Sequence, residues 1–204
     1  MPVNTNRWNR VRYTLWAPIY DRVGRRFDVC RRESFRLLRP APGERILIVG
    51  AGTGADLPHV PPGVTALATD LTPAMLWRAK PRAGPGIHLA VMDGHRLALR
   101  DGTFDAAVLH LILAVVPDPA RCLGEAARAL RPGGRIVVFD KFVRTATPPL
   151  GLRILNLVVG TLATDVTRRF EDILARSETR LRVEHDAPAL LAGFFRHLVL
   201  RKAS

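Results

Sequence analysis

The chain has 204 residues, 48% of them hydrophobic and 24% charged, and its formal net charge is +13. This length accommodates one α/β domain with a full hydrophobic core, and it excludes a Rossmann domain joined to a separate substrate domain of ordinary size. The two cysteines, Cys30 and Cys122, lie far apart and no histidines cluster near them, so we expect neither a disulfide framework nor a bound metal.

The distribution of apolar residues predicts a cytoplasmic protein. Three arginines fall within the first twelve residues and no apolar segment lies among them, so we expect no signal peptide. The longest apolar stretch, at about 150–162, is interrupted by an arginine and an asparagine. It falls short of the roughly 20 apolar residues that a membrane-spanning helix needs, so we expect no transmembrane helix.

The N-terminal segment, residues 1–39, predicts basic amphipathic helices that form a cap. Helical spacing covers 7–16 and then 18–38, and Pro18 separates the two because proline is tolerated only in the first turn of a helix. Between residues 7 and 39, ten arginines stand against three acidic residues, a net charge of +7. Compositional bias is one explanation of the arginine content. It does not explain this concentration, which favours contact with an anionic surface such as phospholipid or nucleic acid.

Residues 40–204 predict one domain in which strands and helices alternate at first. The strands are near-continuous apolar runs between helical patterns, which is typical of a parallel sheet buried on both faces. A helix or turn is expected after Gly54. The remaining elements are strands at 45–50, 64–70, 87–93, 104–113 and 135–142, and helices at 72–80 and 117–130.

The C-terminal part departs from this alternation. An insertion at about 146–178 precedes two β-like runs, 179–186 and 194–202, which predict an antiparallel hairpin at the sheet edge. The apolar part of the insertion suits a lid that lines an acyl pocket or enters a membrane interface, with Arg168 and Arg169 in contact with the substrate. A helix pair that covers the core and leaves these arginines solvated is an equally good interpretation.

The loop after the first strand, VGAGTGA at residues 49–55, matches two nucleotide-binding fingerprints. Gly50, Gly52 and Ala55 fit the G-x-G-x-x-[GA] of dinucleotide-binding units, whereas Gly50, Gly52 and Gly54 fit the G-x-G-x-G of S-adenosylmethionine (SAM) enzymes. Asp70 ends the second strand, where a carboxylate can accept hydrogen bonds from both ribose hydroxyls of either cofactor. The loop alone therefore leaves both cofactors open.

Features further along the chain favour SAM. The third strand ends in Asp93 and Gly94, and a second acid there can accept a hydrogen bond from an adenine amino group. A dehydrogenase of this length would need a catalytic Tyr-x-x-x-Lys or a separate substrate domain, and the sequence offers neither.

The linked motifs VGAGTG, TDLTPAML, VMDG and RPGGRIVVFD resemble the type 11 group of class I SAM-dependent methyltransferases, which includes bacterial quinone C-methyltransferases and phospholipid N-methyltransferases. The resemblance covers about residues 18–140. It implies an α/β, Rossmann-like fold with a seven-stranded, mostly parallel sheet, SAM as the cofactor and S-adenosylhomocysteine as the product. The cofactor-binding residues that it implies are Gly50, Ala51, Gly52, Gly54, Asp70, Leu71, Met75, Asp93, Gly94 and His110.

Two features depart from the family pattern. Ile48 stands where many members carry an acid that faces the ammonium group of SAM. Another group must then bind this ammonium, and Asp56 is our candidate. Ala114 and Val115 replace a histidine pair that is frequent before VPDP, which weakens the case for quinone chemistry.

Candidate catalytic residues lie on the N-terminal segment and at strand ends. The stretch WAPIYD resembles the Tyr-Asp that the family carries over the cofactor, which places Tyr20 near cofactor and substrate. His110 and Asp140 lie at the end of a sheet where ligands bind in open α/β folds, so either could accept a proton. Alternatively, His110 is a core histidine whose hydrogen bonds are made within the protein. For Asp140 the alternative is an ion pair with Lys141, which is itself a candidate substrate contact.

These features predict methylation of an amphiphile in an anionic membrane, first of all the amine of a phosphatidylethanolamine-type headgroup, by an enzyme bound to the inner face of the membrane. One alternative substrate is a quinone or a soluble small molecule. An alternative of another class, suggested by Ile48, is a non-catalytic scaffold that binds SAM or a membrane surface. Nucleic acid is disfavoured, because HLIL replaces the Asn/Asp-Pro-Pro-aromatic element and aromatics do not interleave with the basic residues.

Overall fold

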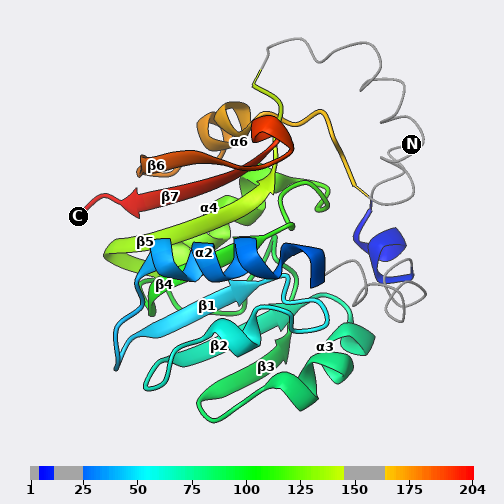
Figure 1. Cartoon of the computed structure of the whole chain (residues 1–204), viewed down its shortest axis with the longest axis vertical. Helices are drawn as coiled ribbons and strands as arrows, with labels where there is room; N and C mark the ends of the chain where they lie inside the picture. Colours follow the sequence, from blue (N-terminus) through cyan, green and yellow to red (C-terminus); the bar gives the residue numbers. More distant parts are fainter. Residues whose placement is uncertain (1–4, 12–24, 145–163) are drawn as a thin grey trace.

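A seven-stranded sheet in the order β3-β2-β1-β4-β5-β7-β6 forms the centre of the structure, which is a computed structural model (Figure 1). The structure describes residues 5–11, 25–144 and 164–204. The strands are β1 (Arg45–Val49), β2 (Thr65–Asp70), β3 (Ile87–Val91), β4 (Phe104–His110), β5 (Leu130–Lys141), β6 (Leu181–Leu190) and β7 (Phe195–Lys202).

Strand direction follows the predicted pattern. The strands β3, β2, β1, β4 and β5 run parallel, and β7 pairs antiparallel with both β5 and β6. In β1 every residue from Ile46 to Val49 is buried, as the near-continuous apolar run requires. The predicted mostly parallel sheet with a C-terminal antiparallel hairpin at its edge is therefore confirmed.

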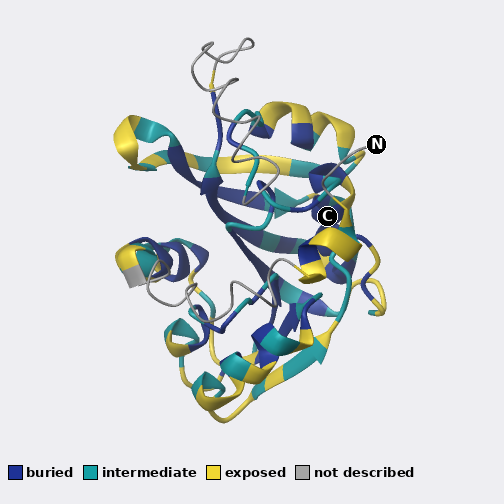
Figure 2. Ribbon diagram, turned by 90° about the vertical axis from the view of Figure 1, so that its right-hand side faces the viewer, coloured by how far each residue is buried: buried dark blue, intermediate teal, exposed yellow. Residues whose placement is uncertain are grey.

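Helices cover both faces of this sheet (Figure 1). One face packs against α2 (Asp28–Leu38) and α3 (Pro73–Ala79), and the other packs against α4 (Pro119–Ala129) and α6 (Phe170–Arg176). Figure 2 shows the resulting layers, with buried strands in the middle and helices whose outer surfaces are exposed. Short 3₁₀ turns complete the described elements: η1 (Arg25–Phe27), η2 (Leu57–His59), η3 (Lys80–Arg82) and η4 (Leu191–Gly193).

The N-terminal segment is helical where the structure describes it. Residues 6–11 are helical, and α2 begins at Asp28 after η1. Residues 12–24, with the break expected at Pro18, lie outside the described residues. The apolar face of α2 packs on the sheet through side chains such as Phe35 and Leu38, while Arg32 and Arg36 are exposed as predicted. A boundary between cap and domain at residue 39 stays a prediction.

The segment after Gly54 forms the short turn η2, in agreement with the expected helix or turn, and Pro58 occupies a first-turn position in it. Two other elements differ in detail from the sequence-based expectation. The helix α4 starts at Pro119, because the Asp118 side chain caps it by accepting the Arg121 N–H at 3.1 Å. The strand β5 starts at Leu130, earlier than residue 135, because the sheet register shifts and leaves Leu130 paired with Phe104.

Of the insertion predicted at 146–178, the described part is 164–178, which contains α6. Its apolar stretch at 150–162 lies outside the described residues. Within residues 5–11, 25–144 and 164–204, no helix has the length and apolar character that crossing a bilayer requires.

The strand order places a topological switch point between β1 and β4. From β1 the chain proceeds to β2 and β3 on one side, whereas β4 and β5 lie on the other. The loops at the carboxyl ends of β1 and β4 therefore diverge, and ligands of open α/β sheets bind in the crevice that this divergence leaves.

Candidate cofactor and substrate site

A partly open cavity lies at the carboxyl ends of β1, β2 and β4, where ligands of open α/β sheets bind. Eight of the eleven predicted cofactor residues are in its wall: Gly50, Gly52, Asp70, Leu71, Met75, Asp93, Gly94 and His110. The other three, Ala51, Gly54 and Asp56, are buried and are not part of the cavity wall. The switch point thus brings together residues spread over sixty positions of the sequence.

The glycine loop follows β1 closely. Gly50, Gly52 and Gly54 have φ values of +74°, +55° and +80°, which favour glycine over other residues. A Cβ on Gly50 would lie 2.6 Å from Cδ1 of Ile112, which is also in the cavity wall. A Cβ on Gly54 would lie 2.8 Å from that of Ala79, so Gly54 instead allows the loop to pack against α3.

Asp70 ends β2 and fixes the shape of this loop. Its Oδ2 accepts the Gly52 N–H at 2.8 Å, and its Oδ1 accepts the Thr72 N–H at 2.8 Å. Burial raises the pKa of Asp70, against the opposing effect of these backbone hydrogen bonds. Each carboxylate oxygen retains acceptor capacity, so Asp70 can also accept hydroxyl groups of a ligand.

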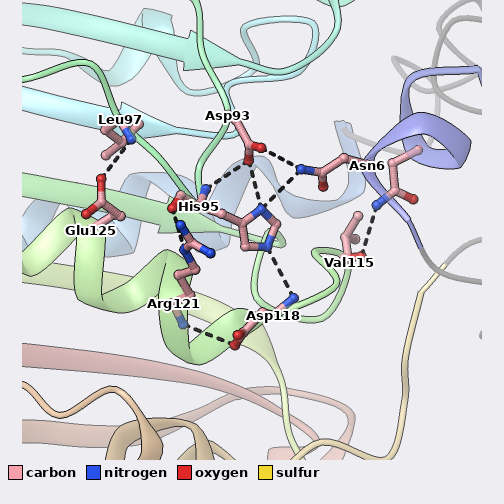
Figure 3. Close-up of polar contacts among 9 residues, drawn as sticks. Asn6, Asp93, His95, Leu97, Val115, Asp118, Arg121 and Glu125 are labelled. Atoms are coloured by element: carbon pink, nitrogen blue, oxygen red, sulfur yellow. Dashed lines mark hydrogen bonds and ion pairs between the residues drawn. The ribbon is translucent and has the colours of Figure 1, made fainter. Parts of the chain in front are cut away.

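A second acid, Asp93, lies after β3 and is held by His95 (Figure 3). Oδ1 of Asp93 accepts the backbone N–H of His95 at 2.9 Å and contacts its ring Nδ1 at 2.8 Å. The backbone N–H of Asp118 donates to Nε2 of the same ring at 3.2 Å. Because Nε2 accepts, we assign the proton of the neutral ring to Nδ1, which donates it to Asp93. His95 thereby links the cavity to the start of α4.

The N-terminal helix at residues 6–11 covers one side of the cavity. Nδ2 of Asn6 donates to Oδ2 of Asp93 at 2.5 Å (Figure 3). Nδ2 of Asn9 donates to the Val115 carbonyl at 3.5 Å. Both asparagines are in the cavity wall. Neither asparagine was identified from the sequence as a site residue. One signal was present, because three of the four asparagines of the chain lie within its first nine residues.

His110 belongs to a buried polar cluster beneath the cavity. Its Nδ1 lies 2.7 Å from Oδ1 of Asp56, and the same oxygen accepts Nη1 of Arg31 on α2 at 2.7 Å. The side chains of Arg31 and Asp56 are 5% and 3% exposed, and that of His110 is fully buried. Burial alone would raise the pKa of Asp56, but the charge of Arg31 and the hydrogen bonds from Arg31 and His110 outweigh it and hold this pKa well below its usual range. The predicted contact of Asp56 with the SAM ammonium stays a prediction.

Ile48 lies in the core and not in the cavity wall. Its side chain is 1% exposed and packs with Phe35 of α2 and Val108 of β4. The position that carries an acid in many family members is therefore apolar and enclosed in this protein.

Asp140 and Lys141 form the ion pair that was the alternative to a substrate contact, with Nζ of Lys141 3.7 Å from Oδ1 of Asp140. Asp140 is fully buried and accepts the backbone N–H groups of Ala114 and Lys141, each at 2.9 Å. Neither side chain is in the cavity wall. Asp140 therefore holds the loop after β4, and the catalytic and substrate roles of the pair stay predictions.

Arg168 is also engaged with the loop after β4. Its Nη1 donates to the Leu113 carbonyl, and its Nε contacts Oδ2 of Asp165 at 3.2 Å. Arg169 pairs with Asp172 at 3.1 Å. Their predicted substrate contacts remain untested, and Tyr20 lies outside the described residues.

The rest of the cavity wall is mainly apolar. Besides Leu71 and Met75, it contains side chains that the sequence analysis did not single out: Val49, Met92, Leu111, Ile112, Val115 and Val116. Two carboxylates beside an apolar surface fit a ligand with ribose hydroxyls and an adenine ring, which is the non-reacting part of SAM.

Comparisons with known proteins agree with this geometry. The family described as "Methyltransferase domain" matches residues 47–138. A phosphatidylethanolamine N-methyltransferase of Cereibacter sphaeroides is 33% identical over 193 residues, which cover 91% of this chain and 93% of that protein. A demethylmenaquinone methyltransferase of Beutenbergia cavernae is 34% identical over 148 residues, or 65% of this chain and 59% of that protein.

The fold also has close counterparts among solved structures. A chain in the complex between the Haloferax volcanii Trm112 methyltransferase activator and a methyltransferase superposes with a TM-score of 0.77. It is 16% identical, and the superposition covers 95% of this chain and 96% of that one. Sequence similarity over nearly the full length, the shared fold and the two carboxylates of the cavity lead to one conclusion. The chain belongs to the SAM-dependent methyltransferases, and SAM is its cofactor.

Proposed function

We propose that the protein N-methylates a lipid amine, of the phosphatidylethanolamine type, at the surface of an anionic membrane. The observation that carries this proposal is the outward face of the two helices that border the cavity. On the helix at 6–11, Asn9 is buried toward the cavity, while Arg7 and Trp8 are exposed. One side of this helix thus contacts the cofactor site, and the other presents a cation and an indole ring.

The helix α3 has the same division. Met75 is in the cavity wall, whereas Trp77 is on the solvent-facing side of the helix and is 77% exposed. Arg78 and Lys80 follow it directly. Tryptophan is favoured where water meets lipid, and basic side chains are attracted to anionic headgroups. A membrane that contacts both helices would lie beside the opening of the cavity.

The comparisons support a lipid amine over a quinone. Similarity to the phosphatidylethanolamine N-methyltransferase spans 193 residues, and similarity to the demethylmenaquinone methyltransferase spans 148. Both matches extend beyond the methyltransferase domain at 47–138, but the longer one includes more of the flanking segments, which is where we expect acceptor recognition. Ala114 and Val115, which replace the frequent histidine pair, favour the same choice.

The residues of the cavity are suited to hold SAM in one orientation. Asp70 would accept the ribose hydroxyls, Asp93 would accept the adenine amino group, and the backbone at Gly50 and Gly52 permits close approach of the remainder. SAM supplies a methyl group that is already activated on a sulfonium. The protein has to align the acceptor with this methyl group and exclude water, and alignment alone can lower a barrier by about 7–11 kcal/mol.

A methyl-transfer assay with labelled SAM tests the proposal. Three kinds of vesicle are compared, each with an anionic lipid as the base. The first also contains phosphatidylethanolamine, the second phosphatidylcholine and the third demethylmenaquinone. We expect labelled lipid only with phosphatidylethanolamine. Label in the quinone would favour the quinone alternative, and absence of product with every acceptor would favour the non-catalytic scaffold.

Membrane binding is tested separately by vesicle sedimentation. Four cations lie on or next to the two bordering helices: Arg7, Arg10, Arg78 and Lys80, the last at the C-cap of α3. At about 1 kcal/mol each they contribute roughly 4 kcal/mol, or on the order of a thousandfold in partitioning. We expect binding to anionic vesicles to fall steeply as salt rises to about 0.5 M, where the Debye length is only a few ångströms. Vesicle binding that depends neither on salt concentration nor on lipid charge would contradict the proposal.

A further inference from the structure

In the buried cluster of Arg31, Asp56 and His110, the two nitrogens of the histidine ring differ in their hydrogen bonding. Nδ1 is bonded to Asp56, but Nε2 is buried and has no hydrogen-bond partner in the described part of the chain. A buried polar atom without a partner is costly and calls for an explanation. His110 is also in the cavity wall, and Asp56 is not. Nδ1 is therefore occupied by a residue outside the cavity wall, which leaves Nε2 as the ring nitrogen available to a ligand.

The partners of Nδ1 determine where the proton of the ring resides. The Asp56 carboxylate is ionised and can only accept, so Nδ1 must carry a hydrogen and Nε2 of the neutral ring is an acceptor. Phe35 and Phe139 contact the ring edge-on, at centroid distances of 6.3 and 5.9 Å, and restrict its rotation. The tautomer and the orientation of His110 are thus both fixed by neighbours outside the cavity.

Arg31 balances the charge of Asp56. Without it, a buried carboxylate would either take up a proton or require a fully charged imidazolium beside it. With Arg31 at 2.7 Å, the carboxylate and guanidinium form a neutral pair, and His110 can start neutral. When the ring takes up a proton, the same carboxylate stabilises the imidazolium.

We propose that Arg31 and Asp56 are positioning residues that hold His110 with Nε2 as the proton acceptor for the substrate amine. This assignment rests on the proposed function. The ammonium N–H bond breaks, its electron pair stays on nitrogen, and the proton binds Nε2. The nitrogen then bonds to the methyl carbon of SAM as the carbon–sulfur pair remains on sulfur. His110 finally releases its proton to solvent, so one proton leaves per methyl transferred.

The tautomer of His110 tests the proposal without any substrate. In ¹⁵N NMR of the labelled protein, with resonances assigned through His110→Gln, we expect the neutral ring to carry its proton on Nδ1. Asp56→Asn should weaken this preference, because the amide can also donate. If the wild-type ring carries its proton on Nε2, the proposal is overturned, whatever the acceptor substrate proves to be.

Kinetics separate positioning from cofactor binding. For Asp56→Asn we expect kcat to fall on the order of 10²-fold, as for loss of general base catalysis, with the Kd of SAM within about twofold of wild type. A Kd that rises as much as kcat falls would overturn the proposal and assign Asp56 to the SAM ammonium. An unchanged kcat in a folded Asp56→Asn protein would also overturn it.

Variants of Arg31 add a matched comparison. Arg31→Lys retains the charge and should keep most of the activity, whereas Arg31→Met should lower kcat and leave the Kd of SAM unchanged. Arg182→Met is the control, since the Arg182 side chain is 82% exposed on β6. Loss of kcat in Arg31→Lys equal to that in Arg31→Met, with wild-type thermal stability in both, would contradict a role through charge.

Discussion

Replacement of Asp70 by asparagine probes the centre of the cofactor site. Both oxygens of Asp70 are committed to backbone amides, one to Gly52 in the glycine loop and one to Thr72 before α3. In Asp70→Asn one oxygen becomes an NH₂ donor. Either amide orientation then sets a donor against one of these two backbone N–H groups, so the loop and the predicted ribose contacts are disturbed together.

The expected magnitude follows from the hydrogen bonds that change. A hydrogen bond to a charged group contributes about 1.5–3 kcal/mol, and the ligand is expected to place two hydroxyls on this carboxylate. Asparagine keeps one acceptor, so we expect a net loss of about 3 kcal/mol, which is roughly a hundredfold increase in the Kd of SAM.

Isothermal titration calorimetry with SAM and S-adenosylhomocysteine measures this loss. Asp101→Asn is the control, because the Asp101 side chain is 77% exposed and outside the cavity wall. The wild-type affinity should also fall on acidification. Since burial raises the pKa of Asp70, this loss should begin above the ordinary titration range of an aspartate, near pH 4. A Kd within threefold of wild type in Asp70→Asn would refute this account of the site.

Three further outcomes are expected. Gly54→Ala should lower the free energy of unfolding by about 3 kcal/mol in urea titrations, because the added Cβ would lie 2.8 Å from that of Ala79 at a positive φ, while the folded fraction still binds SAM. Trp77→Ser should weaken binding to anionic vesicles, measured by sedimentation, about tenfold. Val183→Ser, on the strand β6 at the opposite edge of the sheet, should leave this binding unchanged. Hydrogen bonds from Arg196 lower the pKa of Asp186, so this pair stabilises the fold above about pH 4 and its contribution is lost as pH falls through the lowered pKa; Arg196→Gln should unfold with a weaker dependence on acid.

The order of elements could be predicted from the sequence because burial dictates it. A strand covered on both faces must be apolar throughout, as β1 and β4 are, and the loops between such strands need turn residues. Element ends were less predictable. The early start of β5 depends on the pairing of Leu130 with Phe104, a contact between segments that local sequence does not encode.

The cofactor half of the site could also be predicted. Gly50, Asp70 and Asp93 lie at or just after the end of a parallel strand, and topology alone brings such positions to one edge of the sheet. Asn6 could not be placed in this way, because it reaches Asp93 from 87 positions away through the fold of the N-terminal segment. The one available signal was the local abundance of asparagine.

Arg31 shows a different limit of sequence analysis. It lies on the apolar side of α2, four positions after Phe27 and four before Phe35, where a helical pattern predicts a core residue. Its cationic group is buried there because Asp56 provides a carboxylate beneath the helix. An arginine on an apolar stripe is thus a signal for a buried acid, but the identity of that acid emerges only when the strands are assembled.

The two halves of the cavity are held by different kinds of contact, which bears on how acceptor specificity is built. In the cofactor half, side-chain carboxylates bind backbone N–H groups of the loops after β1 and β2, so the ligand-binding groups also hold the loops. On the other side, where we expect the acceptor to bind, the loop after β4 is held through its backbone, with the Ala114 N–H bonded to Asp140 and the Ala114 carbonyl bonded to the Asp165 N–H at 2.8 Å. Leu113 and Val116 of this loop are also buried in the core. The half-buried Leu111, Ile112 and Val115 line the cavity, and we expect substrate choice to be determined by these three side chains.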